Sequence, residues 1–154
     1  MSRERLAKGL LVTAALSTLL IPIVTDAVFL ANAHMNNPAW LPHAKLHCAM
    51  SFFAAASLGF AALAILKVRP TSDRFSMGLA AFLGSAFWVG LIASGLLPGT
   101  SYEFLNDPNF GNVHAPQLGG VPIYPNVMLG VITIAIALAG YWFAHQIESA
   151  KQYR

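Results

Sequence analysis

Four long apolar blocks, separated by polar connections, dominate the hydrophobic pattern of this chain. They cover residues 9–30, 47–66, 75–97 and 126–144. Each block has about 20 residues, and a helix that rises about 1.5 Å per residue crosses roughly 30 Å of hydrocarbon over that length. The pattern therefore predicts an all-α fold, a bundle of four transmembrane helices. We expect residues 1–154 to form a single integral membrane domain.

The composition supports a membrane protein. Hydrophobic residues make up 56% of the chain and charged residues only 10%, whereas an ordinary soluble domain has roughly 25% charged residues. The first block follows a basic start, as the apolar core of a signal peptide does. It is longer than the roughly 7 to 15 residues of such a core, and no clear cleavage site of small residues follows it. We expect it to remain as the first helix.

The basic residues gather on one side of the predicted membrane. With four crossings, Lys45 alone falls on the side opposite the termini. Since cytoplasmic loops carry the excess of Lys and Arg, we expect both termini in the cytoplasm and a multi-pass protein of a bacterial inner membrane. The sequence pI near 9.3 then reflects topology and predicts no nucleic-acid partner. The residues on the side of the termini are Arg3, Arg5, Lys8, Lys67, Arg69, Arg74, Lys151 and Arg154.

Two long connections lie on the side opposite the termini, called the far side below. They cover about residues 31–46 and 98–125. The second is rich in proline, glycine and aromatic residues. Loops of this length are usually functional or disordered, and the aromatic content argues against disorder. We expect a long structured loop on the far side before the fourth helix.

Asp26 is the only carboxylate inside a predicted span, about one turn from its far-side end. A charge at that depth is costly unless it is paired or hydrated, so Asp26 is a candidate catalytic residue. The simpler alternative is an interfacial carboxylate that reaches water.

Three histidines near the start of the second span form the main metal hypothesis. His43 and His47 are four residues apart, which places both rings on one face if that helix begins near Pro42. Two imidazoles on one face can hold a metal ion, and His34 on the preceding loop could add a third ligand. Plain interfacial polar residues are the alternative. We expect Trp40 to lie at the membrane surface, as interfacial aromatic residues do, and it could also wall a pocket.

The residues of the first far-side connection form a motif with fixed spacing. The string His34-x-x-Asn37-Pro38-x-Trp40-x-Pro42-His43-Ala44-Lys45-x-His47, with Leu97-Pro98-Gly99-Thr100 after the third block, resembles a family of small four-helix membrane proteins of uncharacterised function. This resemblance covers most of the chain and implies a fold without an activity.

A more distant resemblance is to styrene oxide isomerase, in its four helices, a histidine-bearing entry to the second span and a long loop before the fourth. That family uses haem b, held through iron by this histidine, as a Lewis acid that turns an epoxide into an aldehyde. The resemblance implies His43 or His47 as the haem ligand. We add Trp40 as a candidate cofactor-binding residue, since it could wall such a pocket. This chain lacks a clear counterpart of the family's Asn after the ligand, and Trp88 or Ser94 stands where a Tyr is expected.

Three functions remain open from the sequence. The first is a membrane-embedded isomerase of a small apolar substrate, using a metal bound by histidine, with haem iron favoured, while Asp26, Asn37 or Tyr102 steers charge or protons. The second is a metal-free isomerase of a lipid or sterol type, with Asp26, His47 and Glu103 in acid–base roles. The third is a hydrophobe-binding or accessory subunit without catalysis, whose glycine and alanine faces pack on a partner or in a homo-oligomer.

Overall fold

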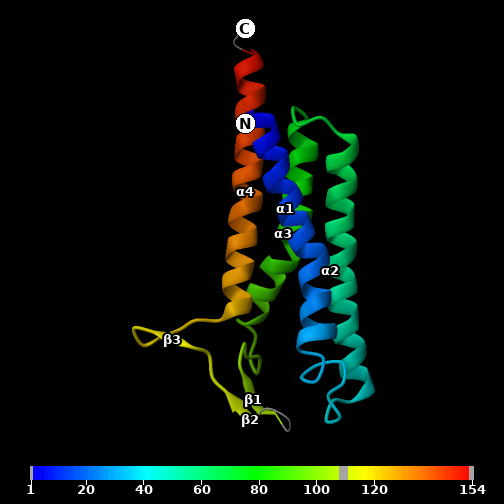
Figure 1. Ribbon diagram of the computed structural model, residues 1–154, viewed down its shortest axis with the longest axis vertical. Helices are drawn as coiled ribbons and strands as arrows, with labels where there is room; N and C mark the ends of the chain where they lie inside the picture. Colours follow the sequence, from blue (N-terminus) through cyan, green and yellow to red (C-terminus); the bar gives the residue numbers. More distant parts are fainter. Residues whose placement is uncertain (1, 108–110, 153–154) are drawn as a thin grey trace.

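A computed structural model describes residues 2–107 and 111–152 and shows four long helices side by side (Figure 1). All four are long and apolar enough to cross a membrane. The all-α prediction of four transmembrane helices is confirmed, and the chain is a multi-pass membrane protein. The start of the first helix and the end of the last lie at the same end of the bundle. The helices are α1 (Arg3–Val24), α2 (Pro42–Val68), α3 (Arg74–Ser94) and α4 (Pro125–Gln152).

The helix ends differ from the apolar blocks for local reasons. α1 begins at Arg3 rather than at residue 9, because the Ser2 hydroxyl accepts a hydrogen bond from the Arg5 amide at 3.4 Å and caps the helix. α2 begins at Pro42 rather than at residue 47, since proline lacks only an amide that a first turn leaves unused. α3 ends at Ser94 and α4 continues to Gln152. Hydropathy marks the membrane part of a helix, whereas caps and polar turns set its ends.

Small side chains let the helices approach closely. A Cβ added to Gly59 on α2 would lie 2.6 Å from both the Ala15 carbonyl oxygen and the Leu19 amide nitrogen of α1. The main core cluster lies in the half of the bundle nearer the termini, so the far-side half has room for a cavity. The cluster consists of Ala7, Leu11, Ala14, Leu66, Met77, Ala80, Ala81, Ala137 and Ala144.

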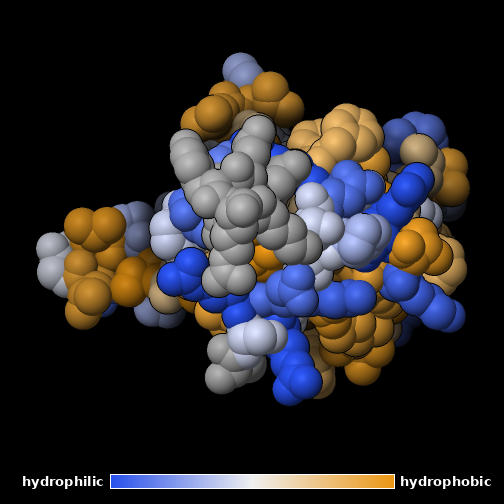
Figure 2. Space-filling view, turned by 90° about the horizontal axis from the view of Figure 1, so that it is seen from above, coloured by the Kyte–Doolittle hydropathy of each residue, from blue (hydrophilic) through white to orange (hydrophobic). Residues whose placement is uncertain are grey.

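Large apolar side chains cover the outer faces of the helices. Phe53, Phe60 and Leu138 are each at least 60% exposed, as expected where lipid rather than protein is the neighbour. Figure 2, viewed from the end of the termini, shows hydrophilic residues at that end and hydrophobic residues around the rim. The surface therefore fits a membrane environment along the helices and water at the end.

The described residues of the loop between α3 and α4, 95–107 and 111–124, are structured, as expected, and include two antiparallel strand pairs. β1 (Phe104–Asp107) pairs with β2 (Gly111–Val113), and β3 (Gln117–Leu118) pairs with β4 (Val121–Pro122). The first hairpin extends the bundle on the far side, whereas the second projects sideways near the start of α4 (Figure 1). Only the first hairpin lies where it can cap the bundle.

Candidate functional site

A cavity of about 440 Å³ lies at the far-side ends of α1, α3 and α4, beside the segment 101–104. Its wall is mainly apolar and includes Ile21, Phe87 and Leu129. The polar groups on the wall include Asp26, His34, Tyr102 and Glu103. The fold thus gathers three of the four predicted catalytic residues and one predicted metal ligand around one space.

A buried polar network separates the cavity from the core. Trp88, which is 2% exposed, borders the cavity and donates its indole N–H to the Thr18 hydroxyl at 2.8 Å. The Thr18 hydroxyl donates in turn to the Gly84 carbonyl oxygen at 2.6 Å. Each donor has a partner, so this side of the cavity is held rigidly by α1 and α3.

An irregular helix end positions Asp26. Pro22 has no amide to donate, and after it α1 widens into a π-helix, η1 (Thr25–Phe29), which the Leu30 amide closes on the Thr25 carbonyl oxygen at 2.7 Å. Such π-turns inside helices are frequent at functional sites. The wider turn carries Asp26 on the cavity wall.

His34 lies beside this carboxylate. Its Nδ1 atom is 3.2 Å from Asp26 Oδ1, and the two side chains are only 20% and 23% exposed. The imidazole is packed against Trp40 and Phe104, with ring centroids 5.4 Å and 5.9 Å away. Packing on both aromatic rings fixes the imidazole against the carboxylate.

The Nδ1 atom of His34 is buried and has no well-aligned hydrogen bond among the described residues. The contact with Asp26 is therefore close in distance but poor in angle. Leaving a buried polar atom unsatisfied costs about 1–3 kcal/mol, and native proteins keep few such atoms. The only charged group close to this nitrogen among the described residues is the Asp26 carboxylate.

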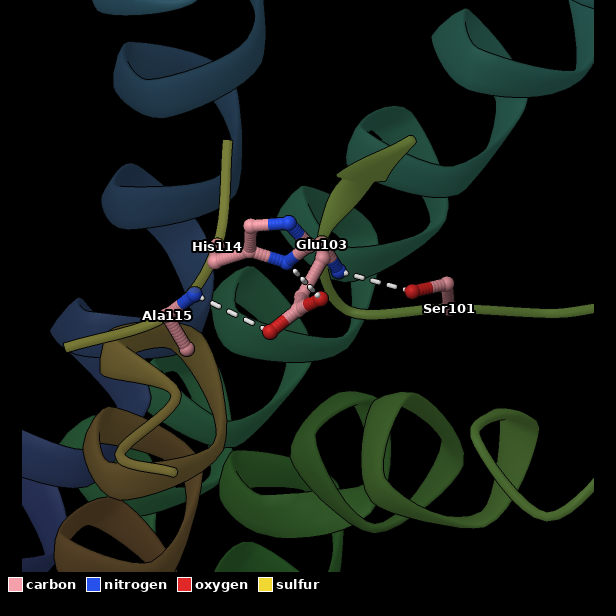
Figure 3. Close-up of polar contacts among 4 residues, drawn as sticks. All are labelled: Ser101, Glu103, His114 and Ala115. Carbon is pink, nitrogen blue, oxygen red and sulfur yellow. Dashed lines mark hydrogen bonds and ion pairs between the residues drawn. The ribbon is translucent and has the colours of Figure 1, made fainter. Parts of the chain in front are cut away.

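Glu103 forms a second polar centre, in which both carboxylate oxygens are used (Figure 3). Oε1 accepts from the Ala115 amide at 3.0 Å, and Oε2 lies 3.0 Å from His114 Nδ1. The Glu103 amide donates to the Ser101 hydroxyl at 3.0 Å. The Ala115 amide, and after it His114, lowers the pKa of the Glu103 carboxyl below its ordinary value of 4.5. The charged Glu103 side chain therefore connects the segments 101–104 and 114–115.

Tyr102 and Asn37 have structural partners. The Tyr102 hydroxyl donates to the Ile92 carbonyl oxygen at 2.6 Å. Asn37 is fully buried, and its Nδ2 donates to the Ala33 carbonyl oxygen and to Asp107 Oδ2, both at 3.1 Å. Asn37 links the first far-side loop to β1, and it is not among the described residues of the cavity wall.

His43 and His47 share one face of α2, as their spacing predicts. Their Nε2 atoms are 3.0 Å apart, and both side chains are exposed. Neither is among the described wall residues of the cavity, and His34 contacts Asp26 instead of this pair. Within residues 2–107 and 111–152, no three His, Cys, Asp or Glu side chains are grouped so that they could hold a metal ion.

The His43–His47 pair fits a single metal ion but not haem b, the two cofactors that the sequence suggested. Two nitrogens bound to one ion at about 2.0–2.1 Å would lie roughly 3 Å apart, so the pair could chelate a single metal ion. A haem also needs an apolar slot for its ring, and both histidines are exposed on the outside of one copy of the chain. The arrangement in one copy does not fit haem b, so no step below uses it.

Comparisons with protein-family models, with curated proteins and with solved structures find no match. The functional argument therefore rests on the geometry of the site. The sequence did not pair His34 with Asp26, although both residues were candidates. The signal was the proline before Asp26, which indicates an irregular helix end that can turn the loop back over the carboxylate.

Proposed function

We propose that the protein is a membrane-embedded isomerase that moves a proton within a small apolar substrate. The carrying observation is the Asp26–His34 contact of 3.2 Å on the wall of a mainly apolar cavity. Small-molecule sites combine such apolar walls with few polar groups, over roughly 300–1,000 Å³. Among the enzyme hypotheses from the sequence, this supports the metal-free acid–base isomerase, with His34 in the place given to His47.

The proposed reaction is a shift of one proton along an unsaturated carbonyl compound. The Asp26 carboxylate removes a proton from the carbon next to the carbonyl, and the electron pair of that C–H bond forms an enolate. The same proton returns to the carbon two positions further along, so the product is an isomer and Asp26 is regenerated. The His34 imidazole lies 3.2 Å from the Asp26 carboxylate and favours its charged, basic form when the imidazole is protonated, and the apolar wall limits access of water to the enolate.

The test uses purified protein in lipid nanodiscs with a panel of apolar β,γ-unsaturated ketones, whose conjugated products absorb in the ultraviolet. Asp26→Asn removes the base while keeping the shape of the side chain, and we expect turnover to fall by about 10²- to 10⁴-fold. Glu4→Gln changes an exposed carboxylate in the first turn of α1 and should keep full turnover. Undiminished turnover in Asp26→Asn would contradict the proposal.

A metal-dependent isomerase remains a second candidate, favoured by the 3.0 Å separation of the His43 and His47 nitrogens. In that case an aryl epoxide added to the panel is converted to an aldehyde. Elemental analysis and an absorbance spectrum of the purified protein distinguish the candidates. His43→Ala or His47→Ala would then remove the metal together with turnover, whereas the Asp26 proposal expects turnover to persist in both variants.

A binding protein without catalysis is the third candidate. It is favoured by the internal partners of the cavity's polar groups, since the Glu103 oxygens and the Tyr102 hydroxyl are already engaged. It would bind the same ketones without converting them, and Asp26→Asn would leave that affinity unchanged.

A further inference from the structure

The hairpin between β1–β2 and α4 is a preformed arm. Residues 116–123 form it, and they are called the β3–β4 arm below. Gly119 and Gly120 make a two-residue turn with φ values of 59° and 81°, the left-handed region that this tight hairpin turn requires. The Ile123 amide donates to the Pro116 carbonyl oxygen at 2.7 Å and closes the base. The arm is therefore an ordered projection.

The arm presents an apolar face without any charge. Leu118 and Val121 are cross-strand partners, so their side chains lie on the same face. They are 73% and 64% exposed. The sequence has no Asp, Glu, Lys or Arg from residue 115 to residue 147. Water is a poor solvent for such a face.

The arm lies beside the outer surface of α4 at its far-side end. It projects sideways from the bundle in Figure 1, and in Figure 2 it forms the largely hydrophobic lobe that extends beyond the helices on the left. A groove of about 350 Å³ runs between the arm and α4, lined by Ile123, Val127, Met128 and Val131 among others. Its apolar lining continues directly into the exposed apolar face of α4.

We propose that the β3–β4 arm lies in the lipid interface of the far-side leaflet and that a phospholipid acyl chain fills the groove. The candidate membrane-spanning helix α4 begins at Pro125, and the arm ends just before it, which favours a place for the arm where this span meets the headgroups. The outer edges of a two-stranded hairpin leave amides and carbonyls unpaired, which the hydrated interface tolerates and the hydrocarbon centre does not.

A second copy of the chain is a weaker occupant. A stable interface needs about 800 Å² from each partner, and an arm of eight residues with two large apolar side chains at its tip offers far less. The groove also continues into the lipid-facing surface of α4. This proposal does not depend on the isomerase proposal.

The experiment places a small fluorescent label on single cysteines in a Cys48→Ala background, in phosphatidylcholine vesicles. Leu118→Cys and Val121→Cys mark the apolar face of the arm. Gln117→Cys marks the position next to Leu118 on β3. Asn112→Cys marks the exposed β2 strand, and Ile132→Cys marks the lipid-facing side of α4. Quenching by lipids with a nitroxide near the headgroup or deep in the acyl chain is compared with quenching by aqueous iodide.

We expect the labels at positions 118 and 121 to be quenched several-fold more by the shallow lipid nitroxide than the label at position 112, and to be protected from iodide. The label at position 132 should respond to the deep nitroxide. If the labels at positions 118 and 121 behave like the label at position 112, the proposal is wrong. It is also wrong if they escape both quenchers and transfer energy between copies, because a second copy then covers the arm. If the label at position 117 is quenched by lipid as strongly as the label at position 118, the label itself drives the insertion, and the claim for the apolar face is wrong.

Discussion

Glu103 is the residue whose charge the far-side loop uses most directly. Its two oxygens join the segment that lines the cavity to His114 and Ala115, the two residues that precede the β3–β4 arm. These hydrogen bonds favour the charged carboxylate and lower its pKa from the ordinary value of 4.5. A group with a lowered pKa in the folded state stabilises the fold above its unfolded-state value, and this contribution is lost as pH falls through the lowered value.

Acidification should therefore loosen the loop at Ala115. We expect the Ala115 amide to be protected from hydrogen exchange above about pH 4.5 and to lose protection at lower pH, after correction for the intrinsic exchange rate. In Glu103→Gln the protection should be weaker and independent of pH in this range. The measurement is amide exchange followed by NMR in detergent micelles.

A probe of the loop itself is needed because a second carboxylate also has a lowered pKa, so it also makes the stability of the fold fall at low pH. Hydrogen bonds from Ser76 lower the pKa of Asp73, which caps α3 at the opposite end of the bundle. Asp73→Asn should leave the Ala115 profile unchanged although it alters acid stability as a whole. An unaltered pH profile in Glu103→Gln would show that another group controls the loop.

Individual site residues were only partly predictable from the sequence. Asp26 was identified because a lone carboxylate in an apolar span is costly, which is a property of the sequence itself. Asn37 was chosen as a catalytic candidate, but its partner Asp107 lies seventy positions along the chain, and such a contact depends on the fold. The pairing of His34 with Asp26 likewise depends on the π-helix after Pro22.

At the scale of elements, the contact between α1 and α2 depends on the missing side chain of Gly59. The added Cβ would meet backbone atoms of Ala15 and Leu19, which cannot rotate away as a flexible side chain could. Helix contacts in membranes depend on such close packing because lipid tails are as apolar as the side chains. A single methyl group must therefore push the two helices apart.

Gly59→Ala should destabilise the bundle, by about 1–3 kcal/mol as for other overpacked cores. The check is the midpoint of thermal unfolding in detergent, where the variant should unfold at a lower temperature than the parent. Gly90→Ala is the matched control, because a Cβ on Gly90 meets nothing within 4 Å and alanine favours helix. Equal midpoints for the two variants would contradict the packing argument.

Helices were predictable and hairpins were not. Each membrane span corresponds to a run of about 20 mainly apolar residues, so all four spans can be located from the sequence. The short strands carry no comparable pattern, since β3 and β4 have two residues each, too few for an alternating pattern to stand out. Only the adjacent Gly119 and Gly120 indicate a tight turn, and their meaning depends on what pairs beside them.

At the scale of the whole molecule, the main core cluster and the candidate site lie at opposite ends of the bundle. Small residues close the half near the termini, and the cavity with Asp26 and His34 opens the far-side half. The basic residues follow the same division: Arg3, Lys67 and Arg74 lie at helix ends on the side of the termini, and Lys45 lies in the first turn of α2 on the far side. The orientation of the chain in the membrane therefore decides which compartment the cavity faces.

The charge distribution predicts that the termini face the cytoplasm, because Lys and Arg are retained on that side during insertion. Single cysteines in a Cys48→Ala background can test this in intact bacterial cells with a thiol reagent that does not cross the membrane. Asn112→Cys on β2 should react in intact cells, whereas Ser72→Cys in the turn between α2 and α3 should react only after lysis. The reverse pattern would place the cavity on the cytoplasmic side and contradict the orientation expected from the basic residues.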